Sequence, residues 1–169
     1  IESKNGKFDQ SIRVFSSFLR TLPDIALQRW DGFLKIFDEV NPRSSRSDLM
    51  RIEVLESFML GRRDFEVSVD LKAKNENIIT DLDEILLQEW NQNALQRFMN
   101  IYSTLRGHDW IRLDQINGRV SRHVDNILLC CQNSSAKIRE GAARAVGEFC
   151  TQCITLNASL ERSRKENEE

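Results

Sequence analysis

Apolar residues recur every three or four positions along most of the chain, which is the spacing of one face of an α-helix. A first stripe ends before Pro23, because proline disfavours a helical residue directly before it. A second stripe ends at the pair 41–42, an Asn-Pro step. The stripes consist of Phe8, Ile12, Phe15, Leu19 and Leu22, and then of Leu27, Trp30, Phe33, Leu34, Phe37 and Val40. They predict the first two helices.

A polar loop over 43–47 precedes a third predicted helix. Ser47 or Asp48 is suited to cap its start, and Gly61 to end it. The segment 65–71 is the exception to the helical pattern, because its apolar residues alternate with polar ones as in a strand. Since no partner strand is visible, we expect an extended connection or a distorted helix there.

In the second half of the chain, Thr80 and Asp83 form a capping arrangement, with an acid three residues after a hydroxyl, and predict a helix start. Two stripes follow, made of Leu82, Ile85, Leu86 and Trp90, and of Leu95, Phe98, Ile101, Tyr102 and Leu105. The segment 106–109 is predicted to be a turn. Gly118 costs a helix interior about 1 kcal/mol relative to Ala. The apolar stripe around it is therefore either one helix or two shorter ones.

A last helix is predicted to begin near Ala136 and to continue through Leu156. Because the stripe does not extend beyond Leu160, the tail 161–169 is predicted to be disordered. The remainder, 1–160, is long enough for one domain with its own core, with an alternative sub-boundary at 61–80.

The composition narrows the class of protein without naming its role. Two prolines in 169 residues favour long helices, since the average proline content is about 5%. The net charge of −2 gives no overall field for nucleic acid or an anionic membrane. No apolar run approaches the roughly 20 residues of a membrane span, and no secretory signal is visible. Because the chain starts at Ile1, we expect it to be part of a longer protein.

Charge is distributed unevenly. The stretch 76–89 holds five acids and no base, whereas 43–63 and 106–122 are rich in arginine. In stacked helical hairpins the turns align along one edge, so basic turns there could form a ridge for an acidic partner. Evenly solvated helix faces are the favoured interpretation. A loop with arginines and Ser44, Ser45 and Ser47 also suggests phosphorylation as a hypothesis.

Four cysteines occur as an adjacent pair, Cys130 and Cys131, and as Cys150 and Cys153. A structural zinc site needs four converging ligands, usually two from a tight turn. Both pairs fall in helical stretches here, so core packing is favoured and a metal or redox role is the alternative. Four cysteines without a secretory signal fit a reducing compartment, the cytoplasm or the nucleus.

No arrangement typical of catalysis is visible. His108 lies in a turn and His123 in a helical stretch, and no strained nucleophile turn, phosphate loop or His-Glu-x-x-His accompanies them. We therefore expect no catalytic residue, no cofactor and no metal, and predict that the protein is not an enzyme.

The clearest motif covers 124–149. A polar turn at 133–135 is followed by Ile138-Arg139, by small residues, and by the aliphatic-glycine step Val146-Gly147. This order resembles the second half of a HEAT repeat, with 124–132 as the first helix. The chain departs from that family at Asn133, where the family has aspartate, and at Ala136, where it has proline.

Trp110 opens a predicted helix directly after a turn. This placement resembles the TOG subclass of HEAT domains, which bind tubulin through a turn tryptophan and basic turn residues. The resemblance implies an edge lined by Trp110, Arg106, Arg112, Lys137 and Arg139. The favoured alternative is that Trp110 packs inward beside Leu113.

The patterns together predict an all-α fold of antiparallel helical hairpins, a HEAT/armadillo-like array of about seven or eight helices. The expected function is a non-enzymatic scaffold for protein–protein interaction that binds a partner protein through an edge or groove. One alternative is a tubulin-binding or microtubule-binding TOG-like domain. The other is a nucleic-acid-associated or enzymatic domain whose site the sequence does not reveal. We expect no membrane partner, and nucleic acid is not the expected partner.

Overall fold

The structure is a computed structural model that describes residues 2–32, 45–64, 72–88 and 92–168. Within these residues it contains eight α-helices, one 3-10 helix and no strand, which confirms the all-α prediction. The chain divides into two compact units, Ile1–Ile85 and Leu86–Glu169, where one domain was predicted. The division falls a few residues beyond the alternative sub-boundary at 61–80.

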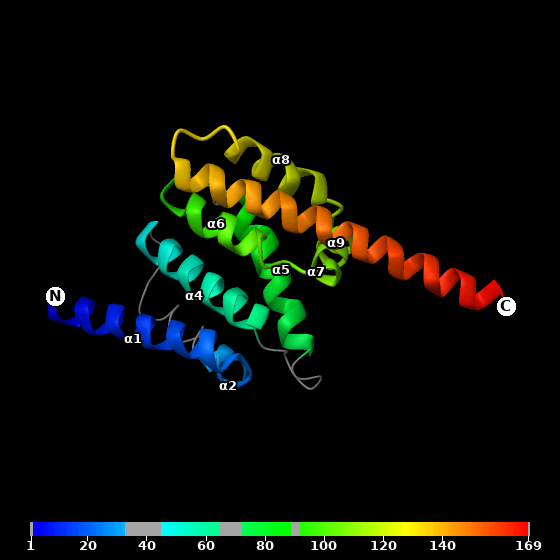
Figure 1. The fold of residues 1–169 in the computed structure, drawn as a ribbon. Coiled ribbons are helices and arrows are strands. Elements are labelled where there is room, and N and C mark those ends of the chain that lie inside the picture. Colours follow the sequence, from blue (N-terminus) through cyan, green and yellow to red (C-terminus); the bar gives the residue numbers. More distant parts are fainter. Residues whose placement is uncertain (1, 33–44, 65–71, 89–91, 169) are drawn as a thin grey trace. The chain divides into compact units, whose positions relative to one another are not determined.

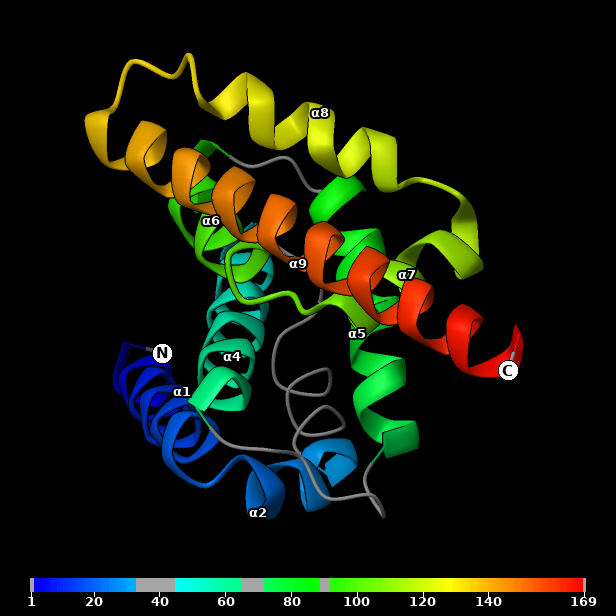
Figure 2. The same cartoon turned by 45° about the vertical axis from the view of Figure 1, so that its right-hand side comes forward.

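The first unit contains helices α1 (Glu2–Thr21), α2 (Pro23–Gln28) and α4 (Ser45–Asp64) and most of α5 (Lys72–Gln88). Helix α1 ends before Pro23, as predicted, and packs along α4 and α2. Helices α1 and α4 run in the same direction (Figures 1 and 2). Between them lies an apolar core in which the Trp30 ring is 5.8 Å from Phe58 and 6.4 Å from Phe15.

Gly61 was predicted to end this helix, but α4 continues to Asp64. A Cβ atom at Gly61 would lie against the carbonyl oxygen of Leu19 and 2.8 Å from Cα of Arg20. Both atoms belong to the backbone of α1. The two helices therefore approach each other closely at this glycine, and its lack of a side chain permits that contact.

Two predicted helix starts also differ from the structure. Helix α4 begins at Ser45, so Ser47 and Asp48 lie inside it. Helix α5 begins at Lys72, which places the predicted cap Thr80 in its interior, and Asp83 is buried. The reason is that the core stripe of α5 already begins at Ile78, which is almost fully buried. The alternating segment 65–71 and the second part of the second predicted helix, 33–40, lie outside the described residues.

The second unit contains the 3-10 helix η2 (Gln92–Ala94) and helices α6 (Leu95–Tyr102), α7 (Gly107–Asn117), α8 (Val120–Cys130) and α9 (Ala136–Glu168). Helix α9 packs against α6, α7 and α8, and α8 and α9 form an antiparallel hairpin (Figures 1 and 2). The apolar stripe around Gly118 forms two shorter helices and not one continuous helix, and both arrangements were predicted as possible. Gly118 has φ 59° and donates its N–H to the carbonyl of Asp114 over 2.8 Å, which ends α7.

Small residues of α9 allow the other helices to approach it, as the motif predicts. Ala142 and Ala145 are fully buried. At Gly141 a Cβ would lie 2.9 Å from Cβ of Met99 in α6. Close packing against α6 therefore depends on the absence of side-chain bulk on this side of α9.

Helix α9 continues to Glu168, where a disordered tail was predicted from 161 onwards. Its side chains from 157 to 167 are all exposed. No glycine or proline follows Gly147 in this helix, and the hydroxyls of Thr151, Thr155 and Ser159 each donate to the carbonyl four residues earlier. The helix therefore extends past its own core contacts. Among the described residues, no helix has the length and apolarity needed to cross a bilayer.

Candidate protein-binding surface

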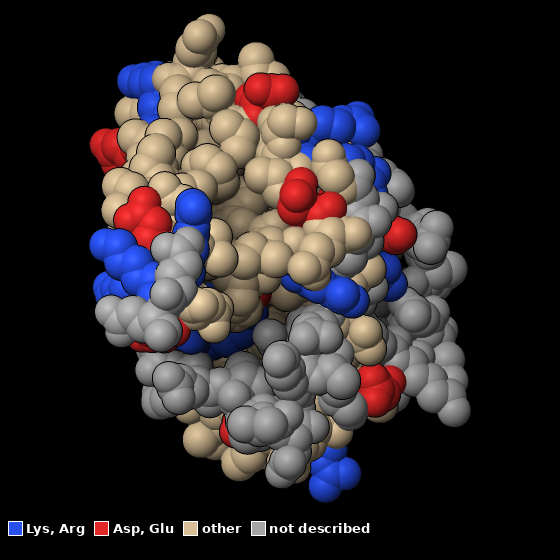
Figure 3. Space-filling view, turned by 90° about the vertical axis from the view of Figure 1, so that its right-hand side faces the viewer, with Lys and Arg blue, Asp and Glu red and all other residues tan. Residues whose placement is uncertain are grey.

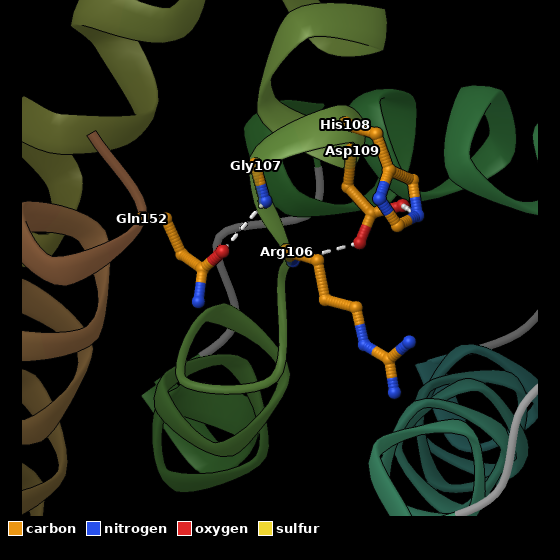
Figure 4. Close-up of polar contacts among 5 residues, drawn as sticks. All are labelled: Arg106, Gly107, His108, Asp109 and Gln152. Atoms are coloured by element: carbon orange, nitrogen blue, oxygen red, sulfur yellow. Dashed lines mark hydrogen bonds and ion pairs between the residues drawn. The ribbon is translucent and has the colours of Figure 1, made fainter. Parts of the chain in front are cut away.

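The predicted edge begins at the turn between α6 and α7. The backbone N–H of Arg106 donates to Oδ2 of Asp109 over 2.8 Å, so a carboxylate closes the first turn of α7 (Figure 4). Asp109 is only 1% exposed, whereas the neighbouring His108 is 65% exposed. Nε2 of His108 lies 3.4 Å from Oδ1 of Asp109. Asp109 thus stabilises a helix start and has a solvent-facing imidazole beside it.

The same turn is held against α9. The N–H of Gly107 donates to Oε1 of Gln152 over 2.9 Å (Figure 4). A Cβ at Gly107 would lie 2.8 to 3.1 Å from side-chain carbons of Leu156. Only glycine fits so close to α9 without displacing Leu156, so the start of α7 has a fixed position on that helix.

Trp110 is 4% exposed and packs inward, which is the favoured of the two predicted arrangements. Its ring stacks on Tyr102 at 6.1 Å and meets the Phe149 ring edge-on at 4.8 Å. No described residue accepts a hydrogen bond from its Nε1. Trp110 therefore does not line an exposed edge, because α7 turns it toward α6 and α9.

His123 completes this aromatic cluster. It is fully buried, and its Nδ1 forms a 2.8 Å hydrogen bond with the hydroxyl of Tyr102. Its ring also meets Trp110 edge-on at 6.4 Å. The spacing of His123, Ile127 and Cys130, four and three residues apart, marks one helix face and is the signal that predicts this burial. The cluster is part of the core.

The remaining predicted residues lie elsewhere. Arg139 donates from Nη1 to the carbonyls of Asn133 and Ser134, each over 2.8 Å, and so holds its own turn together. Lys137 is exposed beside it, and Arg112 is half-buried in α7. Gln152 of α9, which contacts the start of α7, follows Lys137 by 15 residues. This interval corresponds to roughly 22 Å of helix.

The five residues therefore do not form one edge. Arg106, Arg112 and Trp110 belong to the end of the unit near Gln152, and Lys137 and Arg139 belong to the α8–α9 turn. On the face drawn in Figure 3, the blue and red groups of the described residues lie among uncharged ones.

Large apolar side chains on the outside of α8 and α9 were not predicted as a site. Leu128 and Leu129 of α8 are 48% and 66% exposed, and Ile154 of α9 is 70% exposed. The sequence does contain a signal, because Leu128 and Leu129 fall out of phase with the buried positions 123, 127 and 130.

The cysteines also depart in part from the core-packing prediction. Cys130 is buried, and desolvation, with a smaller contribution from repulsion by Cys131, raises the pKa of its thiol. Cys150 and Cys153 are exposed instead, because they lie on a side of α9 that no other described helix covers. The described part of the chain contains no group of three or more His, Cys, Asp or Glu side chains that could hold a metal ion.

Comparisons with protein-family models, with characterised proteins and with solved structures found no match to this chain.

Proposed function

We propose that this chain is a HEAT/armadillo-like segment of a non-enzymatic scaffold, and that it binds a partner protein through the exposed side of α8. The helix–turn–helix over 120–168 supports the repeat assignment, because a polar turn, Arg139 and small inward residues follow in the order of the HEAT pattern, apart from the departures at Asn133 and Ala136. Four free thiols support a reducing compartment, the cytoplasm or the nucleus.

The observation that carries the proposal is the exposure of the adjacent Leu128 and Leu129 near the end of α8. On its inner side the same helix buries His123 and Ile127. Exposed apolar groups gathered on one element are typical of protein-interaction surfaces, since covering them removes apolar area from water. A partner protein that covers these side chains therefore forms a complex that is stabilised by the burial of apolar area.

The tubulin-binding alternative loses its main support. It required Trp110 on an exposed turn together with Lys137 and Arg139, whereas Trp110 is buried and the two basic residues lie at the far end of α9. A TOG-type interaction would have to use other residues of the chain.

Crosslinking of the protein in cells, with the linked peptides mapped onto α8, tests the proposal. A Leu128→Ser/Leu129→Ser variant is expected to lose the partner crosslinks while its thermal unfolding stays unchanged, because both side chains are exposed. Gln132→Ser, also exposed on the α8 side, is the matched control. Full retention of the crosslinks in the double variant, or equal loss in the control, contradicts the proposed surface.

A further inference from the structure

Cys150 and Cys153 form a pair of free, exposed thiols one helical turn apart on α9. Side chains three positions apart on a helix have Cβ atoms about 5–6 Å from each other. A disulfide needs a Cβ separation of roughly 3.5–4.5 Å. The two Cβ atoms are therefore on the same side of α9, but farther apart than a disulfide requires in an intact helix.

The helix is intact around the pair. Thr151 donates its hydroxyl to the carbonyl of Gly147 over 2.9 Å, and Thr155 donates to the carbonyl of Thr151 over 2.9 Å. Both bonds follow the helix ladder across the interval between the cysteines. This regularity holds the two thiols at their spacing.

The helical neighbours of the pair carry no charge. Three and four positions away on α9 lie Val146, Gly147 and Ile154 for Cys150, and Phe149, Leu156 and Asn157 for Cys153. A Cβ at Gly147 would have nothing within 4 Å, so there is open space beside Cys150. Without carboxylates at these positions the pair suits a soft cation and not a hard one such as Mg²⁺ or Ca²⁺.

We propose that Cys150 and Cys153 form a two-thiolate binding site for Cu(I). Zinc takes three or four protein ligands in its usual sites, and the described residues contain no group of three metal-binding side chains. Thiolates select soft ions such as Cu(I), which two sulfur ligands satisfy. On binding, each thiol releases its proton, each sulfur forms one bond to copper, and no electron is transferred. This proposal does not depend on the exposed Leu128 and Leu129 of α8.

Titration of the reduced protein with Cu(I) under anaerobic conditions, in competition with a chromophoric Cu(I) chelator, tests this site. We expect one copper per chain. Cys150→Ser and Cys153→Ser are each expected to weaken binding by at least about tenfold, because loss of even an outer-shell partner costs a metal site that much. The matched control is Cys131→Ser, which removes a half-buried thiol of the other pair and should leave the affinity unchanged.

Alkylation followed by peptide mass spectrometry gives a second readout that does not depend on affinity. Copper is expected to protect Cys150 and Cys153 from iodoacetamide and to leave the reactivity of Cys131 unchanged. Copper binding that survives in the Cys150→Ser/Cys153→Ser variant overturns the proposal, and so does binding that the Cys131→Ser control abolishes. A stoichiometry of one copper per two chains also overturns it, since the ion would then bridge copies.

Discussion

Two glycines in helix interiors are expected to respond to the same substitution with opposite signs. Gly61 of α4 faces the backbone of α1, where an added Cβ would lie 2.8 Å from Cα of Arg20 and 3.0 Å from the carbonyl carbon of Leu19. Gly147 of α9 has nothing within 4 Å of the same position. Alanine therefore meets rigid backbone at one site and solvent at the other.

At both sites the expected change in the free energy of unfolding includes the same gain in helix propensity. Replacing a glycine by alanine in a helix interior stabilises the helix by about 0.5–1 kcal/mol. At Gly147 this gain stands alone. At Gly61 overpacking costs about 1–3 kcal/mol, and the upper part of that range applies because the opposing atoms are backbone, which moves only if α1 shifts. Gly61→Ala is thus expected to destabilise the protein by about 1–2 kcal/mol.

Urea unfolding followed by circular dichroism at 222 nm measures both changes. For a chain of this size 1 kcal/mol corresponds to about 2–4 °C in melting temperature, so thermal scans are an independent check. Gly147→Ala serves as the matched control, because it makes the same chemical change on an open helix surface. If Gly61→Ala raises stability as much as Gly147→Ala, α1 and α4 do not approach each other as closely as the structure shows.

Three further outcomes are expected. Gly118→Ala should lower the free energy of unfolding by about 1–2 kcal/mol, read from urea midpoints, because Gly118 has the left-handed φ of 59° that a side chain disfavours. Tyr102→Phe should cost about 1–3 kcal/mol in the same assay, since it leaves Nδ1 of the buried His123 without its hydroxyl partner, and an unchanged midpoint would contradict that bond. Cys130 should react with iodoacetamide more slowly than Cys150, because Cys130 is buried and burial raises the pKa of its thiol. Its alkylation rate should therefore increase only at a pH above that at which an ordinary thiol becomes reactive. Equal rates in peptide mass spectrometry would refute this.

The limits of sequence reasoning are clear from the glycines. Gly61 and Gly118 both follow an apolar stripe, and each pattern is compatible with a helix end. Gly118 does end a helix, whereas Gly61 is a contact point between helices. The difference depends on which helix lies opposite the glycine, and local spacing contains no information about that.

The candidate surface shows the same division between local and distant contacts. The α8–α9 turn, the start of α9 at Ala136 and the inward alanines follow from local pattern and were predicted. The bond from Gly107 to Gln152 joins residues 45 positions apart, and it depends on the register of α7 against α9. The exposure of Cys153 could not be predicted either, because its stripe continues past the end of the surface that covers it.

The length of α9 has a consequence for how stability is distributed along it. The helix spans 33 residues, and its side chains from 157 to 167 are all exposed, whereas Leu156 lies against Gly107. Opening the exposed final turns therefore removes little buried area, while opening the first half also costs the contacts with α6 and α8. Amide hydrogen exchange should show strong protection near Ala142 and Ala145 that declines steadily after Leu156. One unbroken helix thus contains both a slowly exchanging core and a segment that opens independently of it.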